Sequence, residues 1–214
     1  IAEDGGFLTV PNIYMDKIAV GPGLPDGIVD LDNEPADNLA ALADAKGTKV
    51  TDLVVCMLDR PRHAELIAKI RETGARIRLI QDGDVSGVIA ATQPEAGVDI
   101  FLGIGGAPQG VLAAAALRGV GGQMQGRLVF RNNDQRTEAQ RLGIEDLERK
   151  YATEDMASGN VTFAATGVTY SDMLEGVRYV PGGAITHSMV LRSTTGTLRF
   201  IEGHHDFIRG TAKT

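Results

Sequence analysis

Apolar and polar residues alternate along the middle of the chain in a pattern that predicts strands and helices in turn. Short apolar runs typical of buried parallel strands occupy 52–58, 76–80, 98–102 and 126–130. Segments that separate them carry apolar residues at helical spacing. The order β-α-β-α-β-α-β predicts parallel strands with crossover helices. The three polar loops that follow the first three strands are then expected at one edge of the sheet, where open α/β sheets bind ligands.

The flanking segments add further strands and helices to this prediction. Strands are expected at 7–10, 13–20, 160–166 and in the tail from 177 to 202, with turns at Gly182-Gly183 and Thr195-Gly196. Helices are expected at 33–47, in the charged stretch 132–150 and at 172–176. The simplest fold class is therefore one α/β unit with a mostly parallel sheet.

Glycine is concentrated in Gly103-Ile104-Gly105-Gly106-Ala107-Pro108-Gln109-Gly110, between the strand at 98–102 and the next helix. This stretch predicts a tight turn, with Pro108 in the first turn of the helix and free backbone N–H groups facing the loop. Such a turn can hold an anion, but an ordinary strand-to-helix turn has the same composition. A nucleotide-binding domain is a more distant alternative, because neither a P-loop nor a dinucleotide fingerprint is present.

Charged loops follow two other predicted strands. In Arg60-Pro61-Arg62-His63 two guanidinium groups suit phosphate oxygens, so the loop is either a phosphate clamp or a solvated helix start. In Asp82-Gly83-Asp84 the carboxylates either bind sugar hydroxyls or a metal, or form a turn and a helix cap. For Tyr14 the same two interpretations remain, a binding residue or a structural one, since half-buried phenols are usually core residues.

Composition narrows the class of partner. The 214 residues include 21 Lys and Arg and 28 Asp and Glu, a net charge of -7, which argues against nonspecific binding to nucleic acid or to anionic membranes. The longest apolar run, 111–117, falls short of the ~20 residues that a bilayer requires.

Cys56 is the single cysteine and is expected in the core. A chain without an internal disulfide fits a reducing compartment, so a cytoplasmic location is expected. Three histidines fit no metal motif and are expected to be structural: His187, His204 and His205.

Five ordered motifs resemble those of class II fructose-1,6-bisphosphatases, including the bifunctional fructose-1,6/sedoheptulose-1,7-bisphosphatases. The resemblance runs along essentially the whole chain. It implies the layered α/β fold of inositol-monophosphatase-like sugar phosphatases, and a homo-oligomeric enzyme that uses Mg²⁺ or Mn²⁺. The implied reaction is hydrolysis of the 1-phosphate of fructose 1,6-bisphosphate to fructose 6-phosphate in gluconeogenesis. The motifs are Tyr14-Met15-Asp16-Lys17, Asp59-Arg60-Pro61-Arg62-His63, Asp82-Gly83-Asp84-Val85, Gly103-Ile104-Gly105-Gly106-Ala107-Pro108 and Ala164-Ala165-Thr166-Gly167-Val168-Thr169.

The same resemblance implies which residues contact the sugar phosphate. Matched motif by motif, the contacts are Tyr14, Arg60, Pro61, Arg62, Asp82, Gly83, Asp84 and Gly106. No catalytic residue is identified in this chain. Guanidinium groups, carboxylates and a glycine turn suit a phosphorylated polyol, so the chemistry of the loops agrees with this assignment.

The sequence departs from the family pattern in two ways. Gln109 stands where the family has a glutamate that ligates the metal, and the acidic Asp-Pro metal loop of the superfamily does not occur. Residues 1–47 are therefore expected to be a remnant of the N-terminal metal-binding domain with a connecting helix, and 48–214 the sugar-phosphate-binding domain. We expect little or no turnover from these residues alone. The alternative function is a catalytically inactive sugar-phosphate-binding or regulatory module.

The first departure predicts weakened metal binding. An amide oxygen can ligate Mg²⁺ but lacks the formal charge of a carboxylate, so the Gln109→Glu variant should bind Mg²⁺ and Mn²⁺ more tightly than the given sequence. Titration calorimetry with each metal measures the difference. Equal metal affinity in the two proteins would contradict the prediction.

Overall fold

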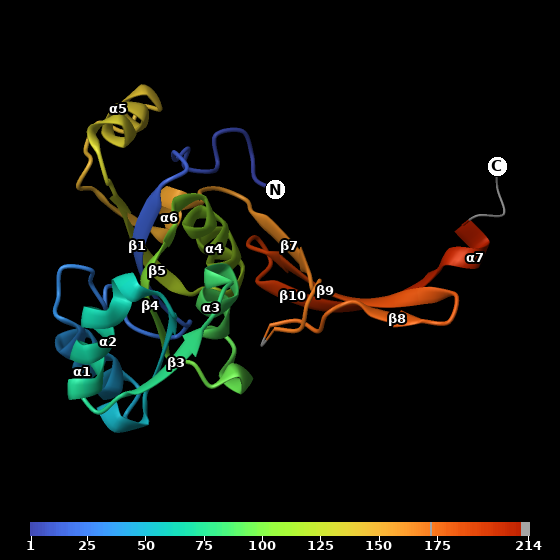
Figure 1. Cartoon of the computed structure of the whole chain (residues 1–214), viewed down its shortest axis with the longest axis horizontal. Coiled ribbons are helices and arrows are strands. Elements are labelled where there is room, and N and C mark those ends of the chain that lie inside the picture. The colour runs from blue at the N-terminus through green and yellow to red at the C-terminus, as the bar shows by residue number, and fades with distance from the viewer. Residues whose placement is uncertain (172, 211–214) are drawn as a thin grey trace.

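The computed structural model describes residues 1–171 and 173–210 and shows a six-stranded sheet with helices on both faces (Figure 1). β2 pairs in parallel with β3 and β4, whereas β1 runs antiparallel to β4 and β5. The strands β2, β3, β4 and β5 therefore share one direction, as the sequence predicts. Across the sheet the order is β3 (Arg76–Ile80), β2 (Val54–Leu58), β4 (Ile100–Gly106), β1 (Tyr14–Val20), β5 (Gln123–Val129) and β6 (Lys150–Ala152).

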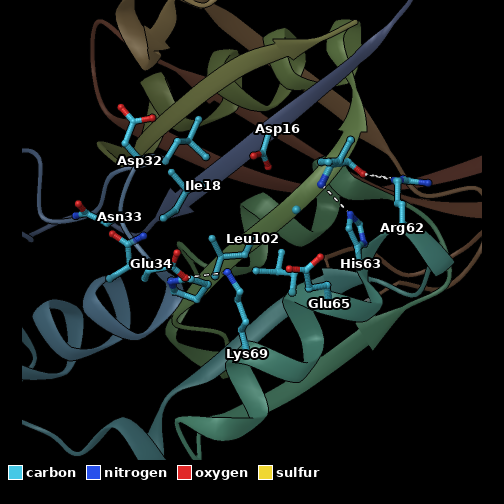
Figure 2. A pocket seen from close by; sticks show the side chains of 16 residues that line it. Asp16, Ile18, Asp32, Asn33, Glu34, Arg62, His63, Glu65, Lys69 and Leu102 are labelled. Carbon is cyan, nitrogen blue, oxygen red and sulfur yellow. Dashed lines mark hydrogen bonds and ion pairs between the residues drawn. The ribbon is translucent and has the colours of Figure 1, made fainter. Parts of the chain in front are cut away.

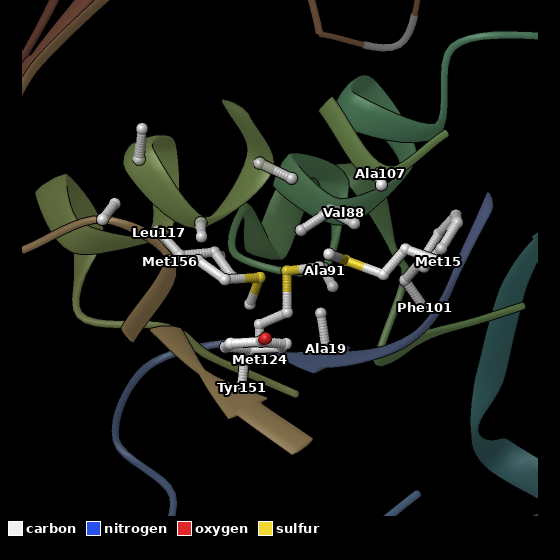
Figure 3. Packing of buried hydrophobic residues seen from close by; sticks show 14 of the residues in the cluster. Met15, Ala19, Val88, Ala91, Phe101, Ala107, Leu117, Met124, Tyr151 and Met156 are labelled. Carbon is white, nitrogen blue, oxygen red and sulfur yellow. The ribbon is translucent and has the colours of Figure 1, made fainter. Parts of the chain in front are cut away.

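Alternating side chains of β1 show how the sheet is covered on its two faces. Ile18 and Val20 are buried in one cluster with residues of α1 (Pro35–Ala45) and α2 (Ala64–Glu72). Met15 and Ala19 point to the other face and are buried with residues of α3 (Asp84–Ala90) and α4 (Ala107–Val120) (Figure 3). Burial on both faces accounts for the continuous apolar run Ile18-Ala19-Val20 at the end of β1. Cys56 lies in the second cluster, so the expectation of a core cysteine is confirmed.

A second sheet packs on the outer side of α3 and α4. It contains β7 (Thr162–Thr166), β9 (Gly183–Arg192) and β10 (Thr197–Asp206), and β8 (Arg178–Val180) pairs with β9. Ile89, Ala116 and Leu191 are buried between this sheet and the two helices. Helices and sheets thus alternate in layers, which the family resemblance implies.

Close packing of α4 depends on its small residues. Ala113, Ala114, Ala115 and Ala116 are all buried. A Cβ atom on Gly119 would approach the Leu191 Cβ to 2.8 Å, so only glycine lets the second sheet come this close to the helix. The remaining helices are α5 (Asn133–Arg141), α6 (Thr153–Met156) and α7 (Phe207–Gly210), with single 3₁₀ turns at Val50–Asp52, Pro61–His63 and Pro94–Ala96.

The structure differs from the sequence prediction at three places. The glycine stretch forms no tight turn, because β4 continues to Gly106 and α4 begins directly after it. Pro108 does lie in the first turn of that helix. Residues 7–10 form no strand, and Phe7 makes an isolated bridge with Ala157. Asp172 lies outside the described residues, and 173–176 form no helix.

Two further observations concern domains and membranes. β1 comes from the segment 1–47 and forms the centre of a sheet whose other strands come from 48–214. The division into two domains stays a prediction. Within 1–171 and 173–210 there is no helix with the length and apolar character needed to cross a bilayer.

Candidate functional site

Five strands bring one end each to the same edge of the six-stranded sheet. β2, β3, β4 and β5 end there, and the antiparallel β1 begins there with Tyr14. In the strand register Tyr14 lies between Gly106 of β4 and Val129 of β5. The segments that follow these strands therefore leave the sheet beside Tyr14.

β4 extends beyond the end of β2, and two side chains from the turn after β2 hydrogen-bond to the part of β4 that β2 does not reach. In the parallel register Leu58, the last residue of β2, is level with Gly103. At the next residue of β4, Arg62 donates from Nε and Nη2 to the Ile104 carbonyl at 2.9 and 2.6 Å, and His63 Nε2 accepts from the Ile104 N–H at 2.8 Å (Figure 2). Both backbone groups of Ile104 are thereby satisfied by the turn after β2.

His63 is held as one neutral tautomer. Its Nε2 accepts a hydrogen bond, so the ring proton is on Nδ1, which donates to the Leu58 carbonyl at 2.7 Å. The side chain is buried, with 1% of its surface exposed. Since both ring nitrogens are engaged, His63 acts as a structural link between β2 and β4.

Two guanidinium groups lie over the Tyr14 ring. The Cζ atom of Arg62 is 4.8 Å from the ring centroid, and that of Arg131, which follows β5, is 4.3 Å away. Both distances lie within the range of cation–π attraction. This arrangement places positive charge at the sheet edge of a chain that is acidic overall.

Beneath the edge, a buried ion pair joins β1, α3 and β4. The Lys17 side chain is 1% exposed, and its ammonium group donates to an Asp84 carboxylate oxygen and, at 3.1 Å, to the Gly106 carbonyl. Burial lowers the pKa of the Lys17 ammonium, an effect that the charge and hydrogen bond of Asp84 oppose. A Cβ atom on Gly105 would collide with the Asp84 carboxylate, so glycine is required at this point of β4.

The structure groups only some of the residues that the sequence predicts as substrate contacts. Tyr14 and Arg62 are in contact, and Lys17 connects Asp84 to Gly106. Because Asp84 is buried and paired, its carboxylate is occupied by Lys17 in this structure. The roles of all these residues toward a substrate stay predictions.

The other predicted contacts lie in different surroundings. Asp82 is exposed and lines, with Gly83 and Tyr170, a separate cavity of about 560 Å³. Arg60 donates to the carbonyl of Asp59 at 2.8 Å, and Pro61 begins the 3₁₀ turn.

A cavity of about 360 Å³ opens between the sheet and the helices α1 and α2 (Figure 2). Asp16, Ile18 and Leu102 line the sheet side, and the Lys69–Glu34 ion pair, at 3.0 Å, lies on the helix side. Burial raises the pKa of the Asp16 carboxyl, which the hydrogen bond from the Lys17 N–H and the charge of Arg127 partly oppose.

The described residues do not fit the metal that the resemblance implies. Within 1–171 and 173–210 there is no group of three or more His, Cys, Asp or Glu side chains that could hold a metal ion. Gln109 is exposed in the first turn of α4, with its side-chain oxygen where a Cβ atom on Gly106 would lie. The three tail histidines contact side chains instead: His187 lies 3.2 Å from Glu175, His204 2.6 Å from Glu202 and His205 2.9 Å from Thr186.

Comparison with known proteins identifies the family. The model of the bacterial fructose-1,6-bisphosphatases described as glpX-encoded matches residues 1–205. The chain belongs to this family. Two similar proteins are both named D-fructose 1,6-bisphosphatase class 2/sedoheptulose 1,7-bisphosphatase. One, from Trichodesmium erythraeum (strain IMS101), is 40% identical over 227 residues, covering 100% of this chain and 65% of the relative. The other, from Synechococcus sp. (strain JA-3-3Ab), is 42% identical over 218 residues, covering 96% of this chain and 62% of the relative.

Family membership confirms the resemblance drawn from the five motifs. The chain spans less than two thirds of the length of these curated relatives. The activity and substrate of the whole protein are therefore proposals for this chain.

Motif reasoning did not assign a role to Asp16, Lys17, His63 or Arg131. Lys17 had a detectable signal, since it occupies an inward position of β1 between Met15 and Ala19, where a charge requires a buried partner. Arg131 had none, because its contact with Tyr14 joins residues far apart in the sequence.

We expect the Lys17→Met variant to lose roughly 3–5 kcal/mol of unfolding free energy, because it leaves the Asp84 carboxylate buried without its partner. Adding Asp84→Asn should recover part of the loss. Urea denaturation measures both variants, with Lys49→Met at an exposed position as control. A double variant that is less stable than the single one would contradict a coupled pair.

The raised pKa of Asp16 predicts a pH-dependent effect of Asp16→Asn. A folded pKa above the unfolded value means that wild-type stability falls as pH rises through the folded pKa, where the buried carboxyl ionises. The variant should therefore be more stable than wild type at about pH 7, with a smaller gain at about pH 4. Urea denaturation at both pH values tests this, and Asp26→Asn at an exposed position serves as control. A gain that is larger at the lower pH would show the opposite linkage.

Proposed function

We propose that this chain provides the sugar-phosphate-binding part of an enzyme that hydrolyses the 1-phosphate of fructose 1,6-bisphosphate to fructose 6-phosphate. One observation carries the proposal: in a member of the fructose-bisphosphatase family, Arg62 lies over Tyr14 at the sheet edge where the motif loops end. Open α/β sheets bind ligands at that edge. Guanidinium groups recognise phosphate oxygens as paired donors.

In this proposal the chain binds and orients the substrate. Arg62 presents Nη1 to a phosphate, because its other donors are held by the Ile104 carbonyl. Arg60 and the carboxylate of Asp82 are further candidates for the phosphate and the sugar hydroxyls. The buried Lys17–Asp84 pair positions β4 and the start of α3.

We derive no step through a metal ion, because the described residues do not hold the required ligands. Dependence on Mg²⁺ or Mn²⁺, a cytoplasmic location and homo-oligomerisation belong to this proposal as properties of the whole enzyme. So does the expectation that the chain alone has little or no turnover.

A second candidate function is a sugar-phosphate-binding or regulatory module without catalysis. Gln109 in place of the family glutamate favours it, since an amide supplies less charge to a metal than a carboxylate does. Both candidates require binding of fructose 1,6-bisphosphate and differ in turnover.

The proposal predicts that the chain binds fructose 1,6-bisphosphate and that Arg62→Gln weakens this binding about tenfold, the effect of losing one charge-assisted hydrogen bond. Titration calorimetry measures the affinity, and a phosphate-release assay with Mn²⁺ or Mg²⁺ measures turnover. Arg71→Gln, in the last turn of α2, is the matched control.

Wild-type chain that does not bind fructose 1,6-bisphosphate would reject both candidates. Substantial phosphate release by the chain alone would reject the expectation of low turnover and the second candidate. Release only by a longer protein that includes this chain would favour the phosphatase.

A further inference from the structure

Arg131 is a cation at the sheet edge whose charge no carboxylate balances. Within the described part of the chain, its guanidinium forms no ion pair, and the same is true of Arg62. Other arginines do have acidic partners, such as Arg127 with Asp32 and Arg149 with Asp155. Two guanidinium groups over one ring, neither of them in a described ion pair, concentrate positive charge locally in a chain of net charge -7.

The position of Arg131 is set by the fold. Tyr14 is level with Val129 in the strand register, and Arg131 follows two residues later. The backbone N–H of Arg131 donates to the Gln135 side chain at 2.8 Å, and Asn132 caps α5 by accepting from the Gln135 N–H at 3.0 Å. These bonds tie the base of the Arg131 side chain to the start of α5. The guanidinium carbon then lies 4.3 Å from the Tyr14 centroid, closer than that of Arg62.

The two arginines have complementary donors available. Nε and Nη2 of Arg62 are held by the Ile104 carbonyl, which leaves Nη1. No described residue accepts a hydrogen bond from the Arg131 side chain, so its whole planar fork is free to bind a phosphate. The guanidinium carbons of Arg62 and Arg131 lie 4.8 and 4.3 Å from the same ring centroid, so the two like charges repel, and an anion that accepts hydrogen bonds from both would relieve that repulsion.

We infer that Arg131, together with Arg62 over the Tyr14 ring, forms a binding site for the dianion of a phosphate monoester. In the proposed function, on which the identification of the ligand rests, this phosphate monoester is one of the two phosphates of the sugar bisphosphate. Arg131 lies outside the five motifs that carry the family resemblance, so it adds a phosphate contact that those motifs do not include. It is a binding residue rather than a catalytic one.

Titration of the chain with inorganic phosphate tests the inference without requiring the sugar. Arg131→Gln should weaken phosphate binding about tenfold, because a charge-assisted hydrogen bond is lost. Arg131→Lys keeps the charge but loses the planar fork, so its affinity should fall between those of wild type and Arg131→Gln. Arg141→Gln in the last turn of α5 changes net charge equally and should bind phosphate as wild type does.

Four outcomes would overturn the inference: no phosphate binding by wild type, wild-type affinity in Arg131→Gln, wild-type affinity in Arg131→Lys, or equal weakening in Arg131→Gln and Arg141→Gln. The last would indicate a general charge effect. A parallel titration with fructose 1,6-bisphosphate separates this inference from the proposed function. If phosphate binding depends on Arg131 while the bisphosphate does not bind, the inference stands and the proposed substrate is wrong.

Discussion

The candidate site depends on one topological constraint, the insertion of β1 against the direction of its neighbours. A parallel sheet brings only carboxyl ends of strands to its functional edge. Because β1 runs antiparallel between β4 and β5, its first residue, Tyr14, reaches that edge as well. An aromatic ring thus stands between loops that arise from several different strands, and it offers a common surface on which their arginines can stack.

Hydrogen bonding maintains this edge where strand pairing ends. β4 is longer than its neighbour β2, and an exposed overhang would leave backbone groups unpaired. Arg62 and His63 hydrogen-bond to the carbonyl and the N–H of Ile104 in this overhang, and the same contacts fix the turn after β2. In the proposed function Arg62 has two tasks, because it supports β4 with two donors and retains a third for a phosphate. The Lys17–Asp84 pair supports β4 from the opposite face of the sheet.

Charge distribution supports the proposal that an acidic chain binds an anion at this edge. Several arginines and lysines of the described surface are paired with carboxylates, so these contribute little local field. The Tyr14 edge is different, because its two guanidinium groups stack on an uncharged ring. In the proposed function, local arrangement rather than net charge therefore determines where a phosphate binds.

Much of the fold is determined by the sequence alone, because hydrophobic periodicity and strand-helix alternation are local properties. They predict the four codirectional strands, the helices between them and the strands of the tail. Ordered motifs likewise identify the family. The glycine stretch shows the limit of local reasoning: its composition favours a turn, but pairing with β1 and the support of Ile104 hold it as strand. Only the tertiary structure placed β1 between β4 and β5, paired Lys17 with Asp84 and brought Arg131 to Tyr14. Those contacts join residues 67 to 117 positions apart, and no local pattern records which distant residues will share a sheet edge.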